Sequence, residues 1–177
     1  FPIELSPALA GGSDEFGTSL AAGHFMGASI ERPALVVGAP GEDVYDHDSA
    51  SWYYEAGAIC QFRIDHAELA APSLHASFDR CDDNPEPMDF ARFGEAVAVG
   101  DFIPLDNNGS FSGEYADVEE IAVGAPGQDS GIVRAGVVTV LEPGWDGADL
   151  THSPTPLSTL VQYHGDQTDA EFGAVLA

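Results

Sequence analysis

Hydrophobic residues occur along the chain in short runs bounded by Gly or Pro, and no run sustains the 3.6-residue period of an amphipathic helix. In one run Cys60 and Phe62 alternate with the polar Gln61, as expected for a strand with one buried face. Such runs predict β-strands joined by turns. We therefore expect a nearly all-β protein, with strands in the segments 17–23, 34–37, 57–64, 94–99, 119–123 and 136–141.

Three short phrases recur along the sequence in a fixed order, which indicates a tandem repeat. The phrases are Phe-Gly, Gly-Ala-Pro-Gly, and Ala-Gly before an apolar run; they begin at Phe16, Gly38 and Ala56 and again at Phe93, Gly124 and Ala135. The first phrase returns at Phe172, so its three copies are spaced 77 and 79 residues apart. Further segments at 2–5, 73–78 and 156–162 precede the Phe-Gly phrases and are candidates for a fourth, outer strand of each unit.

Four-stranded antiparallel units that cannot bury both faces alone are typical of β-propeller blades, which cover one another by stacking. The order of the phrases resembles the FG-GAP repeat, the blade unit of the β-propeller in integrin α subunits and related extracellular proteins. The resemblance implies one repeat module over residues 1–177, with blade one at about 16–78, blade two at about 93–163 and a third repeat beginning at 172–177. It implies calcium in the loop between the first two strands of a blade, and it does not imply an enzyme.

About two complete blades are too few to close a ring, which takes four to eight. We therefore expect part of a longer propeller, or a homo-oligomer when the chain is isolated. The sequence begins at Phe1 without a basic, apolar leader, which suits a mature secreted chain or an excised fragment.

The charge is strongly negative: 5 Arg and no Lys face 30 Asp and Glu, for a net charge of −25. Nucleic-acid binding needs clustered cations and is excluded, and docking on anionic lipid is disfavoured for the same reason. No apolar run approaches the ~20 residues of a membrane-spanning helix, so we expect no membrane insertion. Divalent cations are the expected counter-ions.

The loop of the second copy carries the oxygen donors that Ca²⁺ prefers. Six of its residues are candidate metal ligands: Asp101, Asp106, Asn108, Ser110, Glu114 and Asp117. Two ligand registers stay open, because the family pattern starts at Asp101, whereas the alternating spacing of an EF-hand loop starts at Asp106. An acidic, solvated hairpin loop is the alternative, and Asn108 also begins a glycosylation sequon that would exclude its role as a ligand.

The corresponding loop of the first copy has His24 in place of Asp101, so we expect it to be metal-free. The insertion that follows holds an acidic cluster with one histidine, Asp43, Asp46, His47 and Asp48, which a solvated loop explains better than a metal site. The aromatic run 52–54 in the same insertion fits either a contact patch for a partner or the cover of a neighbouring blade edge.

Cys60 lies in the third strand of blade one and Cys81 lies beyond its outer strand, so we expect a disulfide, with free thiols as the alternative. No nucleophile elbow, zinc-protease helix or phosphate loop is present, and we expect no enzyme. The expected function is an extracellular, calcium-binding module for adhesion or recognition of a protein or glycan at the cell surface or matrix. The alternative is the non-catalytic propeller portion of a larger secreted enzyme, phospholipase-like or polysaccharide-active.

Overall fold

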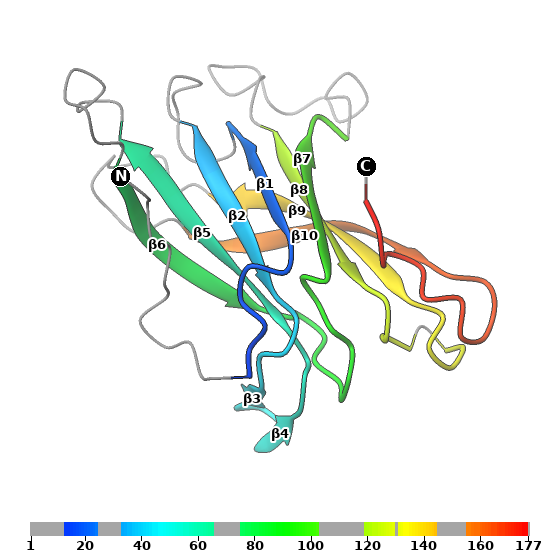
Figure 1. Cartoon of the computed structure of the whole chain (residues 1–177). Coiled ribbons are helices and arrows are strands. Elements are labelled where there is room, and N and C mark those ends of the chain that lie inside the picture. The colour runs from blue at the N-terminus through cyan, green and yellow to red at the C-terminus, as the bar shows by residue number, and fades with distance from the viewer. Residues whose placement is uncertain are drawn as a thin grey trace.

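The structure, a computed structural model, describes residues 13–24, 33–65, 75–102, 119–129, 131–144 and 155–176. These residues form ten β-strands and no α-helix, which confirms the predicted all-β class (Figure 1). Among them no helix has the length and apolar character needed to cross a bilayer.

The strands form two four-stranded sheets and a two-stranded hairpin, and every pair within them is antiparallel. The first sheet has the order β1 (Leu20–Gly23), β2 (Ala34–Ala39), β5 (Ala58–Asp65) and β6 (His75–Asp83). The second has the order β10 (Thr155–His164), β9 (Val137–Gly144), β8 (Glu120–Ala125) and β7 (Ala96–Gly100). The hairpin consists of β3 (Val44–Asp46) and β4 (Ser51–Tyr53).

Each four-stranded sheet contains the strands of one copy of the repeat. The Gly-Ala-Pro phrase ends a strand in both copies, since β2 stops at Ala39 and β8 at Ala125, just before a proline. Proline has no amide hydrogen for the strand ladder, which explains the stop. The expected segment at residues 2–5 lies outside the described residues.

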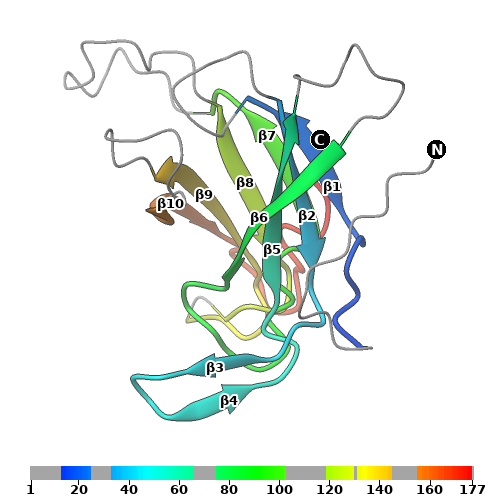
Figure 2. The same ribbon diagram turned by 90° about the vertical axis from the view of Figure 1, so that its left-hand side faces the viewer.

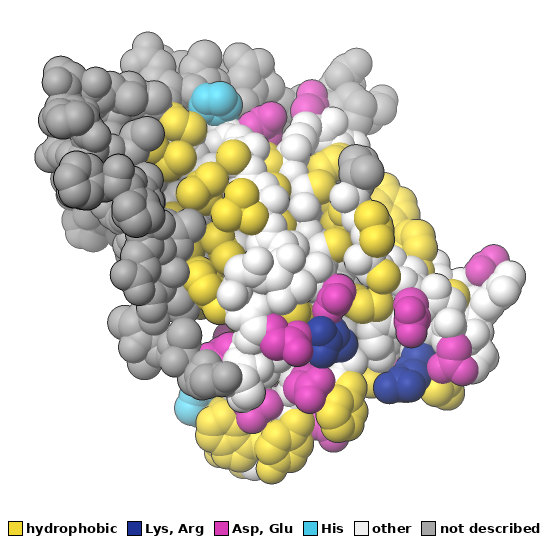
Figure 3. All heavy atoms as spheres, in the orientation of Figure 1, with side chains coloured by type: hydrophobic (Ala, Val, Ile, Leu, Met, Phe, Trp, Pro, Cys, Tyr) yellow, Lys and Arg dark blue, Asp and Glu magenta, His cyan; other side chains and the backbone are white. Residues whose placement is uncertain are grey.

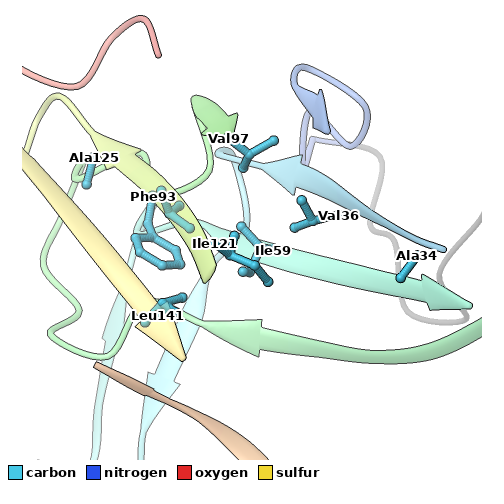
Figure 4. Close-up of a cluster of buried hydrophobic side chains, with 9 residues drawn as sticks. Ala34, Val36, Ile59, Phe93, Val97, Ile121, Ala125 and Leu141 are labelled. Carbon is cyan, nitrogen blue, oxygen red and sulfur yellow. The ribbon is translucent and has the colours of Figure 1, made fainter. Parts of the chain in front are cut away.

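The two sheets pack face to face around an apolar core (Figure 4). Side chains from both sheets meet there, and Phe93 from the connection between them is fully buried in their midst. The buried members are Ala34, Val36, Ile59, Phe93, Val97, Ile121, Val123, Ala125 and Leu141. Each large member stabilises the fold by about 1.5–3 kcal/mol, so this core holds the two copies together.

The first sheet is buried on both faces in its middle. Val37, Cys60 and Phe62 form a second cluster on the face away from the other sheet, where the ring of Phe16 packs on Phe62 at 6.0 Å between centroids. The expectation of a single buried face was wrong for Gln61, which is 2% exposed. Its amide Nε2 donates a hydrogen bond of 2.7 Å to Asp82 Oδ2, which satisfies a polar group at this depth.

The Phe-Gly turns repeat the same backbone geometry in all three copies. The residue before each phenylalanine has a positive φ of 50–58°, and the glycine after it has one of 89–95°. Within a copy, this glycine donates its amide hydrogen to the carbonyl of the Gly-Ala-Pro glycine, at 2.9 Å for Gly17 to Gly38 and 3.0 Å for Gly94 to Gly124. The recurring sequence phrases are thus recurring structural elements.

The junctions between successive copies are also alike. Phe93 donates its amide hydrogen to Ala56 across the first junction, and Phe172 donates to Ala135 across the second, both at 3.1 Å. The Gly-Ala-Pro glycine of one copy lies against the backbone of the next Phe-Gly turn, with no room for a side chain in either case. The third Phe-Gly turn therefore sits on the second sheet as the second turn sits on the first.

Cys60 and Cys81 form a disulfide, which confirms the predicted pairing. They are direct partners on the neighbouring strands β5 and β6, with their Cα atoms 4.0 Å apart. A register shift between Gln61 and Phe62 follows immediately, so the crosslink lies next to a bulge in the sheet.

Candidate functional site

The predicted calcium loop connects β7 to β8, and the structure describes its base. Gly100, the last residue of β7, pairs with Glu120, the first residue of β8. Of the six candidate ligands, Asp101 lies just beyond β7 and is exposed. The other five lie outside the described residues: Asp106, Asn108, Ser110, Glu114 and Asp117.

Two further carboxylates stand at this base, and sequence reasoning missed both as parts of the site. Glu120 is buried and accepts a 2.8 Å hydrogen bond from the amide of Phe102. Glu119 Oε2 accepts a 2.5 Å hydrogen bond from the amide of His24 and lies 3.7 Å from the Nδ1 atom of the same residue. The signal in the sequence was an acidic pair placed directly before the apolar run of β8.

The base therefore links the two copies, since His24 follows β1, the strand of the first sheet that is equivalent to β7. The backbone carbonyl of His24 also accepts a 3.4 Å hydrogen bond from the Glu119 amide. Within the described residues, no three His, Cys, Asp or Glu side chains are grouped so that they could hold a metal ion.

The hairpin β3–β4 projects from the opposite end of the first sheet (Figure 2). The sequence predicts a loop here, and the structure shows that this loop contains a short antiparallel ladder with Tyr45 opposite Trp52. Asp46 closes its turn by accepting backbone hydrogen bonds from Asp48 at 2.9 Å and Ser49 at 3.3 Å. Hydrogen bonds from the Ser49 side chain and the Asp48 amide lower the pKa of Asp46, so this carboxylate stays ionised in mild acid.

One face of the hairpin is anchored and the other is exposed. Val44 is buried, whereas Trp52 is 59% exposed and Tyr45 is 37% exposed. The Tyr45 ring centroid lies 5.1 Å from that of Trp52 and 4.9 Å from that of His47. We call Tyr45, His47 and Trp52 the hairpin patch; Figure 3 shows hydrophobic side chains gathered at this end of the molecule with acidic side chains around them.

Two carboxylates of the acidic cluster in the insertion accept hydrogen bonds from backbone amides. Asp43 Oδ1 accepts the Glu55 amide at 2.9 Å, and Asp46 closes the hairpin turn. The side chains of Asp43 and Asp46 thus order the hairpin, and no member of the cluster belongs to a group that could hold a metal ion within the described ranges.

A second acidic pair was missed altogether. Asp14 is 8% exposed, and its buried Oδ2 has no hydrogen-bond partner among the residues described. The pKa of the neighbouring Glu42 is raised to about 7, mainly by burial, then by the charge of Asp14 and a hydrogen bond with it, with smaller contributions from Asp83 and Asp43. The second copy has the uncharged Gln128 at the position of Glu42, so a carboxylate at this position is particular to the first copy.

No protein-family model matches the sequence, and a search of curated proteins found none that matches it.

Proposed function

We propose that this chain is a segment of an FG-GAP β-propeller that acts as an extracellular recognition module, with calcium in a structural role and no catalytic activity. The observation that carries the proposal is the likeness of the two junctions. At both, a Phe-Gly turn packs its backbone against the Gly-Ala-Pro glycine of the preceding copy. Sheets that stack on their neighbours through one repeated contact are typical of propeller blades.

Recognition, in preference to catalysis, is supported by the way the two copies differ. The core strands and junction contacts are common to both copies, whereas the connection carrying the exposed aromatic hairpin is particular to the first. Binding residues concentrate on loops held by a rigid scaffold, so the difference supports the hairpin as the recognition element of this proposal. The disulfide supports an extracellular location, since such bonds persist in oxidising compartments.

Calcium would bind in the loop that connects β7 to β8, at the end of the sheets opposite the hairpin. Asp101 at the base and the donors Asp106, Asn108, Ser110, Glu114 and Asp117 provide hard oxygen ligands within one loop. The carboxylates among them repel one another at neutral pH, so binding of a divalent cation would order the loop.

Calorimetric titration of the metal-stripped protein tests the proposal. We expect one calcium ion per chain and a gain in unfolding free energy of about 2.7 kcal/mol at a hundredfold excess over Kd. The double substitution Asp106→Ala with Asp117→Ala should abolish that gain, while His24→Ala, in the equivalent loop of the first copy, should leave it unchanged. Absence of binding at millimolar calcium contradicts the proposal.

Homo-oligomerisation through the outer faces of the two sheets belongs to the same proposal. The net charge of −25 opposes self-association at low salt, so light scattering should show the larger species at high ionic strength first. A monomeric mass at high protein and salt concentration would show that these faces are covered.

A further inference from the structure

We propose that the hairpin patch binds an arginine- or lysine-rich segment of a partner protein. The inference rests on the proposed recognition function and names the chemistry of its ligand. The patch offers aromatic faces for cation–π contact, and the carboxylates beside it offer charge-assisted hydrogen bonds.

Within the residues that the structure describes, the second copy forms an equivalent sheet without such a hairpin. Residues 42–55 lie in the connection from β2 to β5, and half as many residues, 128–134, take their place in the connection from β8 to β9. The two ends of the connection are fixed in the same way in both copies. Gly57 donates to the Glu42 carbonyl as Gly136 does to that of Gln128, each at 3.0 Å.

The neighbouring contact is likewise common to both copies. The carbonyl of Tyr54 accepts a 2.7 Å hydrogen bond from Phe90, and the carbonyl of Val133 accepts a 3.1 Å bond from Asp169. The extra residues of the first copy thus add an exposed aromatic ladder without changing the scaffold. Val44 is the one buried residue of this addition, which the structure describes throughout, so its exposed aromatic side chains are best explained by a ligand.

The patch is held rigidly before any ligand arrives. Asp46 closes the turn of the hairpin that carries the patch. At the base of the hairpin, the Tyr54 amide donates a 2.9 Å hydrogen bond to Asp89 Oδ1. Rigid aromatic side chains lose little conformational entropy on binding, which makes them effective anchors.

The charge around the patch decides which ligand fits it. Residues 42–55 contain five carboxylates and no Lys or Arg. Arg92 lies at the base of the hairpin, but its guanidinium already contacts Glu15, Glu55 and Glu95 at 2.6–3.3 Å. A purely apolar partner would remove water from the carboxylates of the hairpin without pairing them. A cationic segment would pair them.

Guanidinium suits the site best. Its planar group can stack on Trp52 or Tyr45 while its fork donates to a carboxylate such as Asp48, which is exposed in the turn of the same hairpin. A second copy of this chain is a poor occupant, because its surface has the same strong negative charge.

Fluorescence anisotropy with a labelled peptide of alternating Arg and Gly, eight residues long, at 150 mM salt tests the proposal. We expect Trp52→Ala and Tyr45→Ala each to weaken binding about tenfold, the loss of about 1.4 kcal/mol expected for a cation–π contact. Tyr163→Ala is the matched control, because Tyr163 is a similarly exposed aromatic residue (53%) on β10. Replacing residues 42–55 by 128–134 should remove specific binding while the thermal unfolding of the protein stays cooperative.

Two results would overturn the proposal. Equal affinity of Trp52→Ala and Tyr163→Ala for the peptide would show attraction to the acidic surface in general. Binding of neutral cellohexaose that depends on Trp52, with no binding of the peptide, would assign the patch to glycans. Calcium titration of Trp52→Ala separates this proposal from the previous one, since calcium binding should be as in the unsubstituted protein.

Discussion

Gly94 places its carbonyl oxygen where a side chain on Gly38 would have to lie. The same relationship joins Gly173 to Gly124 one copy later. Because glycine has no side chain, the backbone of the next Phe-Gly turn can lie directly against it. The spacing between successive sheets is therefore set by main-chain atoms. Side chains then fill the rest of the junction, with Phe93 at its centre.

Substitution of the junction glycine should be far more costly than substitution of its equivalent at the free turn. Gly94 has a φ of +95°, and a Cβ there would lie 2.5 Å from the Ala58 carbonyl oxygen. Gly17 has a φ of +93° with nothing within 4 Å. We expect Gly94→Ala to lower the unfolding free energy by about 3 kcal/mol and Gly17→Ala by about 1 kcal/mol, measured by urea denaturation. Equal losses would show that backbone conformation alone matters.

Removal of the disulfide should destabilise the protein by about 3 kcal/mol, because the bond closes a loop of 21 residues in the unfolded chain. The double substitution Cys60→Ala with Cys81→Ala removes the crosslink without leaving a thiol. Thermal unfolding of the double variant should match that of the reduced parent protein. Unfolding at the temperature of the oxidised parent would contradict the prediction.

Glu42 should make stability fall as the pH rises. Its pKa in the folded protein, about 7, is above the ordinary value of 4.5. Between these values the folded state holds a proton that the unfolded state has lost, so stability decreases from pH 4.5 to 7 and is constant above. Because Glu42 is only half-buried, solvent screening reduces the effect of its charge. We expect Glu42→Gln to raise the free energy of unfolding by about 1 kcal/mol at pH 8 and to leave it unchanged at pH 4.5.

The causes of this pKa shift can be separated with a second variant. Asp14→Asn removes a nearby charge but leaves the burial of Glu42 unchanged, so the pH dependence should shrink without vanishing. Unfolding in urea at pH 5 and pH 8 measures both variants. A parent protein equally stable at the two values, with Glu42→Gln unchanged, would refute the assignment.

Arg92 should contribute to stability in a salt-dependent way. It contacts three carboxylates from three different turns: Glu15, Glu55 and Glu95. Arg92→Met leaves them without this cation, so we expect a loss of about 1 kcal/mol at low salt that shrinks in 1 M NaCl. Arg134→Met, at the equivalent of the Glu55 position, is the control and should change little at either salt concentration.

Repetition made the strands of the core predictable. Each copy supplied an independent reading of the same pattern, and β2 and β8 cover the predicted segments 34–37 and 119–123 to within a residue at the start. Both strands end two residues later than expected, at Ala39 and Ala125. The disulfide was predictable because the strand order placed Cys60 and Cys81 side by side. Local periodicity failed at Gln61, because a strand between two packed faces buries residues of both parities.

The parts that differ between copies could not be predicted in the same way. The hairpin occurs once, and its strands are only three residues long, too short for an alternating pattern to stand out. Asp14 and Glu42 are far apart in sequence, and no local pattern shows that folding brings them together. Of the candidate calcium ligands, Asp101 is placed at the strand end, while the remaining assignment stays a prediction.

The crosslink between β5 and β6 also changes how the chain responds to mechanical tension. A pull applied to both ends passes directly from Cys60 to Cys81, so the 21-residue segment that they close carries no load. At about 3.4 Å per extended residue, the oxidised chain releases roughly 70 Å less length than the reduced chain when it is stretched.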